Sequence, residues 1–250
     1  MMTSPMVQLP LSFLPILALC SHLAAFLGHF LSHRRIGKST AWMGFLLLAG
    51  TAMINWSLVH RLPVYSLYES LLHMALVLSG CLIVLSTTRP GHSALTWGNL
   101  LLTILLIAAV PVLGQFNPDF YMYQVWPVQL FFALRLTAGG VFLFAFLLFA
   151  TAWPQEYNST RNGAELLRLA DLVLILAAIL FLGSELSGTI WCMLGWGDTW
   201  HWSSNFFQSA SIFLLLMLPL HIPPGWKKGA FRAGAGSICT LIAALAIIIP

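Results

Sequence analysis

Charged side chains are scarce in this sequence, and their scarcity excludes most classes of soluble protein. Asp, Glu, Lys and Arg make up 7% of the 250 residues, whereas soluble domains carry about 25%. Hydrophobic residues account for 59% of the chain. We therefore expect an all-α, polytopic membrane helix bundle. The formal net charge of +4 comes from residues in short loops, where membrane topology explains it, so we expect no nucleic-acid partner.

The sequence also lacks the motifs of disulfide-linked, thiol-redox and hydrolytic proteins. Its four cysteines are scattered and form no C-x-x-C pair, which excludes a disulfide framework and covalent heme attachment. No H-E-x-x-H motif and no Ser/His/Asp arrangement is present. No Lys or Arg precedes the first apolar run, so residues 11–31 are predicted to be a spanning helix and not a cleaved signal peptide.

Long apolar runs divide the chain into about eight predicted transmembrane helices. A helix needs roughly 20 apolar residues to cross the hydrocarbon core of a membrane. Residues 1–250 are predicted to form a single transmembrane bundle without a separate soluble domain. The predicted spans are 11–31, 41–60, 67–86, 94–113, 129–152, 165–186, 205–221 and 233–250.

Basic residues predict the orientation of these spans. They follow the first, third, fifth and seventh spans, whereas the alternate loops hold only Arg61. Because loops rich in Lys and Arg stay in the cytoplasm, both termini are predicted on the outer side of the membrane. The residues that make this pattern are Arg34, Arg35, Lys38, Arg89, Arg161, Lys227, Lys228 and Arg232.

Four of the ten tryptophans fall within twelve residues, between the sixth and seventh spans. An ordinary aromatic belt at a membrane surface needs fewer tryptophans and no interleaved glycines. Indole faces are flat and apolar, and glycine lets the backbone approach a ligand closely. We therefore interpret residues 188–204 as an outer segment that faces a large planar ligand. Its main residues are Trp191, Trp196, Gly197, Trp200 and Trp202.

Ionisable residues within the predicted spans need a partner or a function, because each costs at least a few kcal/mol at mid-membrane. Glu69, Arg135 and Glu185 lie at similar predicted depth. Two interpretations stay open: a structural cluster between helices, or a site that holds the propionates of a porphyrin. Histidines are numerous too, with eight in the chain, but their spacing alone does not select a metal site.

Two separated motifs resemble the heme-handling proteins of cytochrome c biogenesis, the CcsA/ResC, CcmC and CcmF group. Residues 191–202, W-C-M-L-G-W-G-D-T-W-H-W, are similar to the tryptophan-rich (WWD) signature of that group. Residues 63–71, P-V-Y-S-L-Y-E-S-L, resemble the P-x-S-N-x-Y-E-S-L element of CcsA, the nearest subgroup. The similarity covers about residues 40–222.

The resemblance implies a multi-pass protein of the bacterial inner membrane that binds heme b. A histidine ends the corresponding span in CcsA and is a heme ligand, so His221 is implied as the ligand of the heme iron. His29 and His33 are the candidates for a second axial ligand. The residues implied to contact the porphyrin are Tyr68, Glu69, Arg135, Trp191, Trp196, Gly197, Trp200 and Trp202.

The chain departs from the family at the ligands of the outer heme. Ser203 stands where the signature has an acidic residue, and the fifth span lacks the family's external histidine. No Gly-Leu-His element, which supplies the second external ligand, is present. We therefore do not expect an active heme lyase or synthase without a partner.

Two functions remain as alternatives. In the first, the protein handles heme for cytochrome c maturation with a ResB-like partner that supplies missing ligands. In the second, it is a structural or electron-transfer subunit of a respiratory membrane complex, beside a multiheme cytochrome c, with one heme b that a quinol reduces. A HemX-like role in heme synthesis is a third option. A transporter is disfavoured, because no discontinuous helix pair or inverted repeat is visible. Membrane lipid surrounds the protein in every case.

Overall fold

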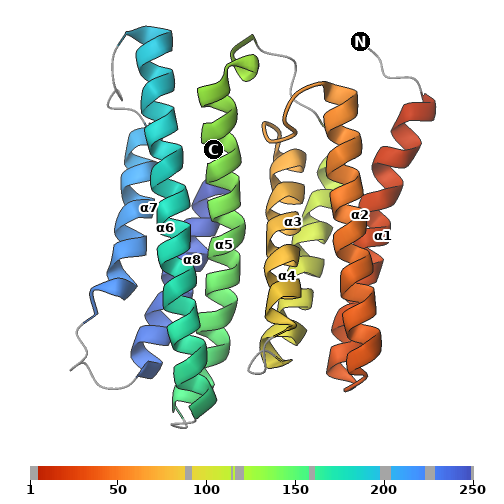
Figure 1. Cartoon of the computed structure of the whole chain (residues 1–250), viewed down its shortest axis with the longest axis vertical. Helices are drawn as coiled ribbons and strands as arrows, with labels where there is room; N and C mark the ends of the chain where they lie inside the picture. The colour runs from red at the N-terminus through yellow and green to blue at the C-terminus, as the bar shows by residue number, and fades with distance from the viewer. Residues whose placement is uncertain are drawn as a thin grey trace. The chain divides into compact units, whose positions relative to one another are not determined.

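A computed structural model describes residues 5–87, 92–113, 115, 121–157, 161–197, 204–222 and 229–248 of the chain, and the secondary structure in these ranges is entirely helical. Each α helix overlaps one predicted span, so the all-α prediction is confirmed (Figure 1). The helices are α1 (Pro5–Phe30), α2 (Arg34–Val59), α3 (Leu67–Leu85), α4 (His92–Ala109), α5 (Trp126–Tyr157), α6 (Arg161–Trp196), α7 (Ser204–Leu220) and α8 (Gly229–Ile248), with 3-10 helices η2 (Val110–Val112) and η3 (Tyr121–Gln124) before α5.

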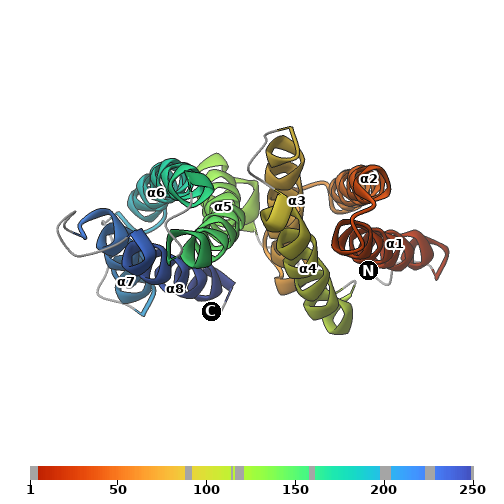
Figure 2. The same cartoon turned by 90° about the horizontal axis from the view of Figure 1, so that it is seen from below.

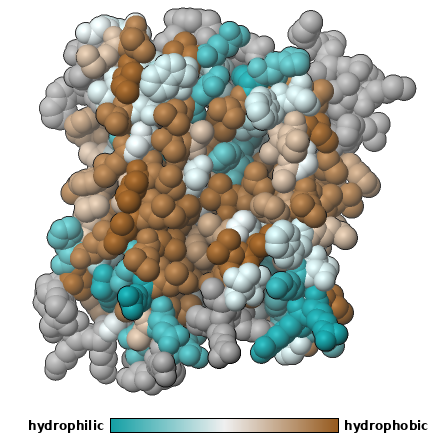
Figure 3. All heavy atoms as spheres, in the orientation of Figure 1, coloured by the Kyte–Doolittle hydropathy of each residue, from teal (hydrophilic) through white to brown (hydrophobic). Residues whose placement is uncertain are grey.

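Seven of these helices are long and apolar enough to cross a membrane. The exception is α7, which has 17 residues. Hydrophobic side chains cover the visible surface along the middle of the helices, and hydrophilic side chains gather toward the helix ends (Figure 3). The chain is therefore a multi-pass membrane protein.

The sixth helix is longer than its predicted span and takes in half of the tryptophan-rich segment. Residues 188–196, predicted to follow the sixth span, form the last turns of α6. The helix continues there because Trp191 packs against α5 and Cys192 is buried. Gly197 ends the helix with a φ of +73°, a conformation that glycine adopts readily, and its N–H donates to the carbonyl of Met193.

The chain divides into two compact units, Met1–Asp119 with α1–α4 and Phe120–Pro250 with α5–α8. Within each unit consecutive helices run in opposite directions (Figures 1 and 2). We name each end of a unit by the helices joined there: the α1–α2 and α2–α3 ends of unit 1, and the α6–α7 and α7–α8 ends of unit 2. Whether residues 1–250 form one bundle stays a prediction.

Glycines let α1 and α2 of unit 1 pack closely. A Cβ atom placed on Gly28 would lie 2.8 Å from the backbone nitrogen of Gly37, so the two helices meet backbone to backbone. The ring of His29 lies over Gly37, and the ring of His22 lies over Gly44. The two histidines are seven residues apart on α1, and the two glycines are seven residues apart on α2. Both histidines therefore point from one face of α1 onto α2.

In unit 2, α5 packs against both α6 and α8. Small residues of α8 allow this approach: a Cβ atom placed on Gly236 would lie 2.8 Å from the ring of Phe149 on α5. The remaining helix, α7, packs against α8 and has few contacts with α6. The side of α6 that faces α7 is therefore only partly covered by protein.

Candidate functional site

Arg135 of α5 is the polar centre of unit 2 near its α6–α7 end. Its Nη1 donates to Oε1 of Glu185 on α6 at 2.6 Å and to the hydroxyl of Ser209 on α7 at 3.1 Å. Its Nη2 donates to the side-chain carbonyl of Gln208 at 3.1 Å, and the Gln208 amide donates to the carbonyl of Ala246 on α8 at 2.6 Å. One guanidinium thus connects all four helices of the unit.

The environment of this guanidinium is largely apolar. The side chains of Arg135 and Glu185 are only 9% and 18% exposed. The guanidinium carbon also lies 5.4 Å from the ring centroid of Phe131 and 5.6 Å from that of Phe181, within the range of cation–π attraction. The Arg135–Glu185 pair is therefore enclosed and fully engaged, as an ion pair inside a membrane bundle has to be.

Aromatic residues lead from Arg135 to the end of α6. Phe131 and Phe132 of α5 contact Trp191, with ring centroids 6.0 and 6.4 Å apart. Trp191 in turn contacts Trp196, with centroids 5.5 Å apart. We call these four residues the aromatic platform. Trp196 is 61% exposed, so one indole of the platform is open to the surroundings while the others support it.

One polar atom of the platform lacks a partner. The indole Nε1 of Trp191 is buried and has no hydrogen-bond acceptor among the residues that the structure describes. Indole N–H is a donor only, and a buried donor without an acceptor costs about 1–3 kcal/mol. An acceptor brought by a ligand would remove that cost.

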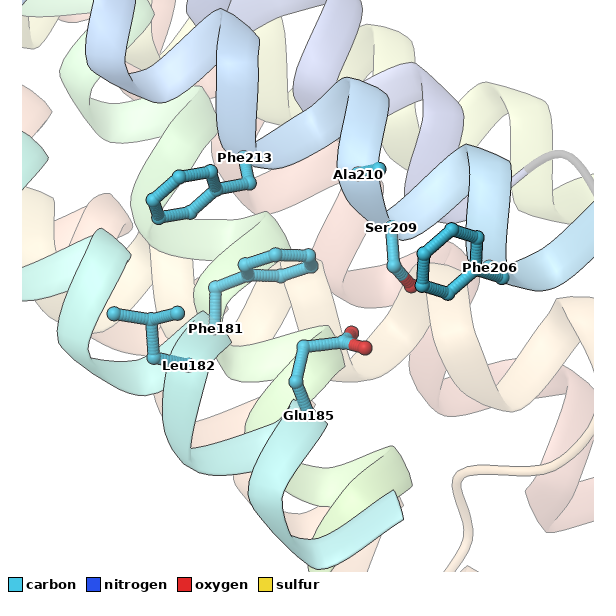
Figure 4. A pocket seen from close by; sticks show the side chains of 7 residues that line it. All are labelled: Phe181, Leu182, Glu185, Phe206, Ser209, Ala210 and Phe213. Atoms are coloured by element: carbon cyan, nitrogen blue, oxygen red, sulfur yellow. The ribbon is translucent and has the colours of Figure 1, made fainter. Parts of the chain in front are cut away.

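A groove of about 290 Å³ opens between α6 and α7, beside the ion pair. Figure 4 shows Glu185 pointing into the space between the two helices, toward Ser209, with Phe181 beside it. The lining is almost entirely apolar apart from the Glu185 carboxylate and the Ser209 hydroxyl. The lining residues are Phe181, Leu182, Glu185, Phe206, Ser209, Ala210 and Phe213.

Tyr68 and Glu69 lie in unit 1, buried at the start of α3. Ser66 and Glu69 form a capping box in which the Glu69 carboxylate accepts from the N–H of Ser66 at 2.8 Å. The same carboxylate accepts from Nη1 of Arg61 at 3.2 Å and from the N–H of Tyr65 at 2.9 Å. Residues 66–69 of the P-V-Y-S-L-Y-E-S-L motif thus cap the start of α3, and Glu69 also forms a buried ion pair with Arg61.

Of the three ionisable residues predicted at similar depth, Glu69 therefore belongs to a different ion pair from Arg135 and Glu185. The partner of Glu69 is Arg61, a residue of the loop between α2 and α3. The side chain of Arg61 is 4% exposed. The predicted structural cluster is thus two separate ion pairs, one in each unit.

His29 and His33 lie at the α1–α2 end of unit 1, where His29 is buried and His33 is exposed. Among the histidines whose side chains the structure describes, His22 is the most buried, with 1% exposed. Its Nδ1 lies 3.0 Å from the side-chain oxygen of Asn99, and its Nε2 lies 3.4 Å from the hydroxyl of Ser79. Both ring nitrogens of His22 are therefore engaged within the bundle.

His221 follows α7 at the α7–α8 end of unit 2 and is exposed. Its Nδ1 lies 2.8 Å from the carbonyl oxygen of Met217. When Nδ1–H donates to a carbonyl, Nε2 is left as the nitrogen that can bind a metal. The 17 residues of α7 span about 26 Å, so His221 is far from the aromatic platform.

Within unit 2, the structure brings together several residues of the predicted site. Trp191, Trp196 and Gly197 lie at the α6–α7 end of unit 2, and Arg135 lies deeper in the same unit beside Glu185. Trp200 and Trp202 lie outside the described residues. In the described ranges, no group of three or more His, Cys, Asp or Glu side chains is placed to hold a metal ion.

Comparisons with known proteins assign no family: no family model matches the sequence, and no curated protein is similar to it at a significant level.

The residues at the α6–α7 end fit two parts of a heme group. The aromatic platform suits the ring, and the Trp191 N–H suits a propionate carboxylate. Among the described residues at that end no histidine is present to bind the iron.

Proposed function

We propose that this chain is a heme-binding membrane protein of the cytochrome c assembly type and that it holds the porphyrin on the aromatic platform. The observation that carries the proposal is the Trp191–Trp196 pair. One indole is 61% exposed, and the other has a buried N–H without an acceptor in the described part of the chain. An exposed, supported aromatic face beside an unused donor suits a planar ligand with carboxylates at its edge.

Each residue of this end has a distinct role in the proposal. Trp196 offers its face to the ring, and Trp191 donates a hydrogen bond to a carboxylate. Arg135 is engaged with Glu185 and supports the platform through its contact with the ring of Phe131. A Cβ atom placed on Gly197 would meet no heavy atom within 4 Å, so a ligand can approach the backbone there. Heme b, when bound, supplies a redox-active iron.

An iron ligand has to come from elsewhere, and this agrees with the departures from the WWD family noted in the sequence. We place that ligand on a partner, either a ResB-like protein or a multiheme cytochrome c complex. The chain then binds and positions heme in cytochrome c maturation and is not an active synthase by itself.

The proposal includes an orientation in the bacterial inner membrane. Eight spans with the basic loops in the cytoplasm put the α6–α7 end of unit 2 and both termini in the periplasm. Cytochrome c is assembled on that side, so the aromatic platform faces the compartment in which heme is needed.

A second candidate function is supported by His221. The hydrogen bond from its Nδ1 to the Met217 carbonyl is the arrangement that orients histidines for metal binding through Nε2. Binding of a heme iron through Nε2 would place one heme b near the cytoplasm. The protein would then be an electron-transfer subunit of a respiratory complex.

Hemin titration of the purified protein in lipid nanodiscs, followed by visible spectroscopy and a pyridine hemochrome assay, tests both candidates. Trp196→Ala should weaken hemin binding at least tenfold if the platform holds the porphyrin, and His221→Ala should leave it unchanged. Trp97→Ala is the matched control, because Trp97 is 54% exposed on α4 of unit 1.

The opposite result selects the second candidate. If His221→Ala abolishes binding and Trp196→Ala does not, the heme lies at the α7–α8 end. If both variants and the control bind hemin as the wild type does, hemin binds the protein without a defined site, and the platform proposal is wrong.

A further inference from the structure

The groove between α6 and α7 is distinct from the aromatic platform and needs its own explanation. It exists because α7 packs on α8 and leaves the facing side of α6 partly uncovered. Its rim is open to the surroundings: Leu182 is 47% and Phe213 is 37% exposed. In a membrane-spanning unit such an opening faces lipid, so the groove is accessible to lipid-soluble molecules.

The polar atoms of the groove lie deep in the bundle. Glu185 is eleven residues before the end of α6, or about 16 Å, and Ser209 is five residues after the start of α7, or about 8 Å. A phospholipid headgroup stays at the membrane surface and does not reach this depth. Acyl chains reach this depth, but they carry no hydrogen-bond donor for a carboxylate.

The Glu185 carboxylate determines which hydrogen-bonding group a ligand of the groove must carry. Oε1 of Glu185 accepts from Arg135, and the side chain still lines the groove with 18% of its surface exposed. An ionised carboxylate is only an acceptor, so a complementary ligand carries a hydroxyl that donates. The phenyl rings of Phe181, Phe206 and Phe213 surround this acceptor with apolar surface, which suits an aromatic ring.

We propose that this groove binds a membrane quinol, with a ring hydroxyl donating to the Glu185 carboxylate, the ring lying among the three phenylalanines, and the apolar tail leaving through the opening toward lipid. Its volume of about 290 Å³ is just below the roughly 300–1,000 Å³ that is typical of ligand pockets. It therefore suits one or two rings and not a porphyrin. The inference is one of binding, and it does not depend on heme being bound at the platform.

The test uses the full chain in phosphatidylcholine nanodiscs, a photoreactive azido-decylubiquinol, and peptide mapping of the labelled residues. Labelling should concentrate on residues 181–185 and 206–213 and should fall at least tenfold in Ala210→Trp, where the indole fills the groove. Ser211→Trp is the matched control, because Ser211 is the next residue of α7, is exposed, and does not line the groove.

Glu185→Gln tests the hydroxyl donor separately. The wild type should prefer unlabelled decylubiquinol over decylubiquinone as competitor by about tenfold, and the amide variant should lose that preference, because an amide can also donate to a quinone carbonyl. Hemin titration of Ala210→Trp separates the two proposals, since it should match the wild type.

Two outcomes would overturn the quinol proposal. One is labelling spread evenly over the lipid-facing helices and unchanged by Ala210→Trp, which would mean that acyl chains fill the groove. The other is equal competition by quinol and quinone in the wild type, which would mean that Glu185 does not recognise a hydroxyl.

Discussion

Arg135 Nη1 and Glu185 Oε1 lie 2.6 Å apart, and this ion pair joins α5 to α6 in the interior of unit 2. The same guanidinium reaches α7 through Ser209 and α8 through Gln208. Hydrophobic burial gives helices in lipid little preference for each other, so polar contacts and close packing of small residues determine how they associate. Arg135 therefore has a structural role in holding the four helices around both proposed ligand sites.

Replacing Arg135 by Leu should destabilise unit 2 by about 3–5 kcal/mol, because Glu185 is left charged and without its partner. The double variant Arg135→Leu with Glu185→Leu should recover part of that loss, since no unpaired charge remains. Unfolding in detergent with increasing SDS measures both. Arg168→Leu is the control, because Arg168 is exposed on α6 and its loss should change stability by no more than about 0.5 kcal/mol. Equal stability of the Arg135 and Arg168 variants would contradict the structural role.

The start of α3 allows a graded prediction. Ser66→Ala removes one side of the capping box and should cost about 1 kcal/mol. Glu69→Ala removes the other side and also leaves Arg61 buried without its carboxylate, so it should cost about 3–5 kcal/mol. The same SDS unfolding measurement separates them. If Glu69→Ala is no worse than Ser66→Ala, the Arg61–Glu69 pair contributes nothing beyond the cap.

Two glycines of α2 should respond to alanine with opposite signs. A Cβ atom on Gly44 would lie 2.6 Å from Nε2 of His22, whereas one on Gly50 would meet nothing within 4 Å. Gly50→Ala should therefore stabilise the helix by up to about 1 kcal/mol. Gly44→Ala should instead destabilise unit 1 by about 1–3 kcal/mol, because the His22 ring has to move away from Asn99.

A double-mutant cycle checks the physical reason for that difference. In a His22→Ala background the clash is absent, so Gly44→Ala should become neutral or stabilising. If Gly44→Ala costs the same in both backgrounds, the His22 ring is not what limits the size of residue 44.

The helices could be predicted from the sequence because their apolar runs match the thickness of a membrane. The ion pairs could not, since apolar runs predict the depth of a residue but not the direction in which it points. Glu69, Arg135 and Glu185 share a predicted depth, yet Glu69 pairs with Arg61. The signal that was missed is Arg61 itself, the one basic residue in a loop otherwise free of them.

The predicted end of the sixth span, residue 186, is wrong for a different reason, since α6 continues to Trp196. Glycines and tryptophans after residue 186 resemble a loop in composition, but tertiary packing overrides this weak local preference. Trp191 contacts Phe131 and Phe132 of α5, and Ser187, Gly188 and Cys192 are buried on the same stretch. No sequence pattern marks these contacts, because they depend on how α5 and α6 face each other.

Because α7 has only 17 residues, a measurement of membrane topology on both sides of it tests whether it spans the membrane. We expect eight spans, so alkaline phosphatase fused after residue 197 should be active in the periplasm and one fused after residue 222 should be inactive. Fusions of green fluorescent protein at the same two sites should give the reverse pattern. The apolar stretch of α7, Phe206–Leu220, is about 22 Å long, less than the roughly 30 Å of hydrocarbon, so its insertion depends on support from α8. If both fusions report the same side, α7 does not span, His221 lies on the same side as the aromatic platform, and the basic residues before α8 no longer follow the positive-inside rule.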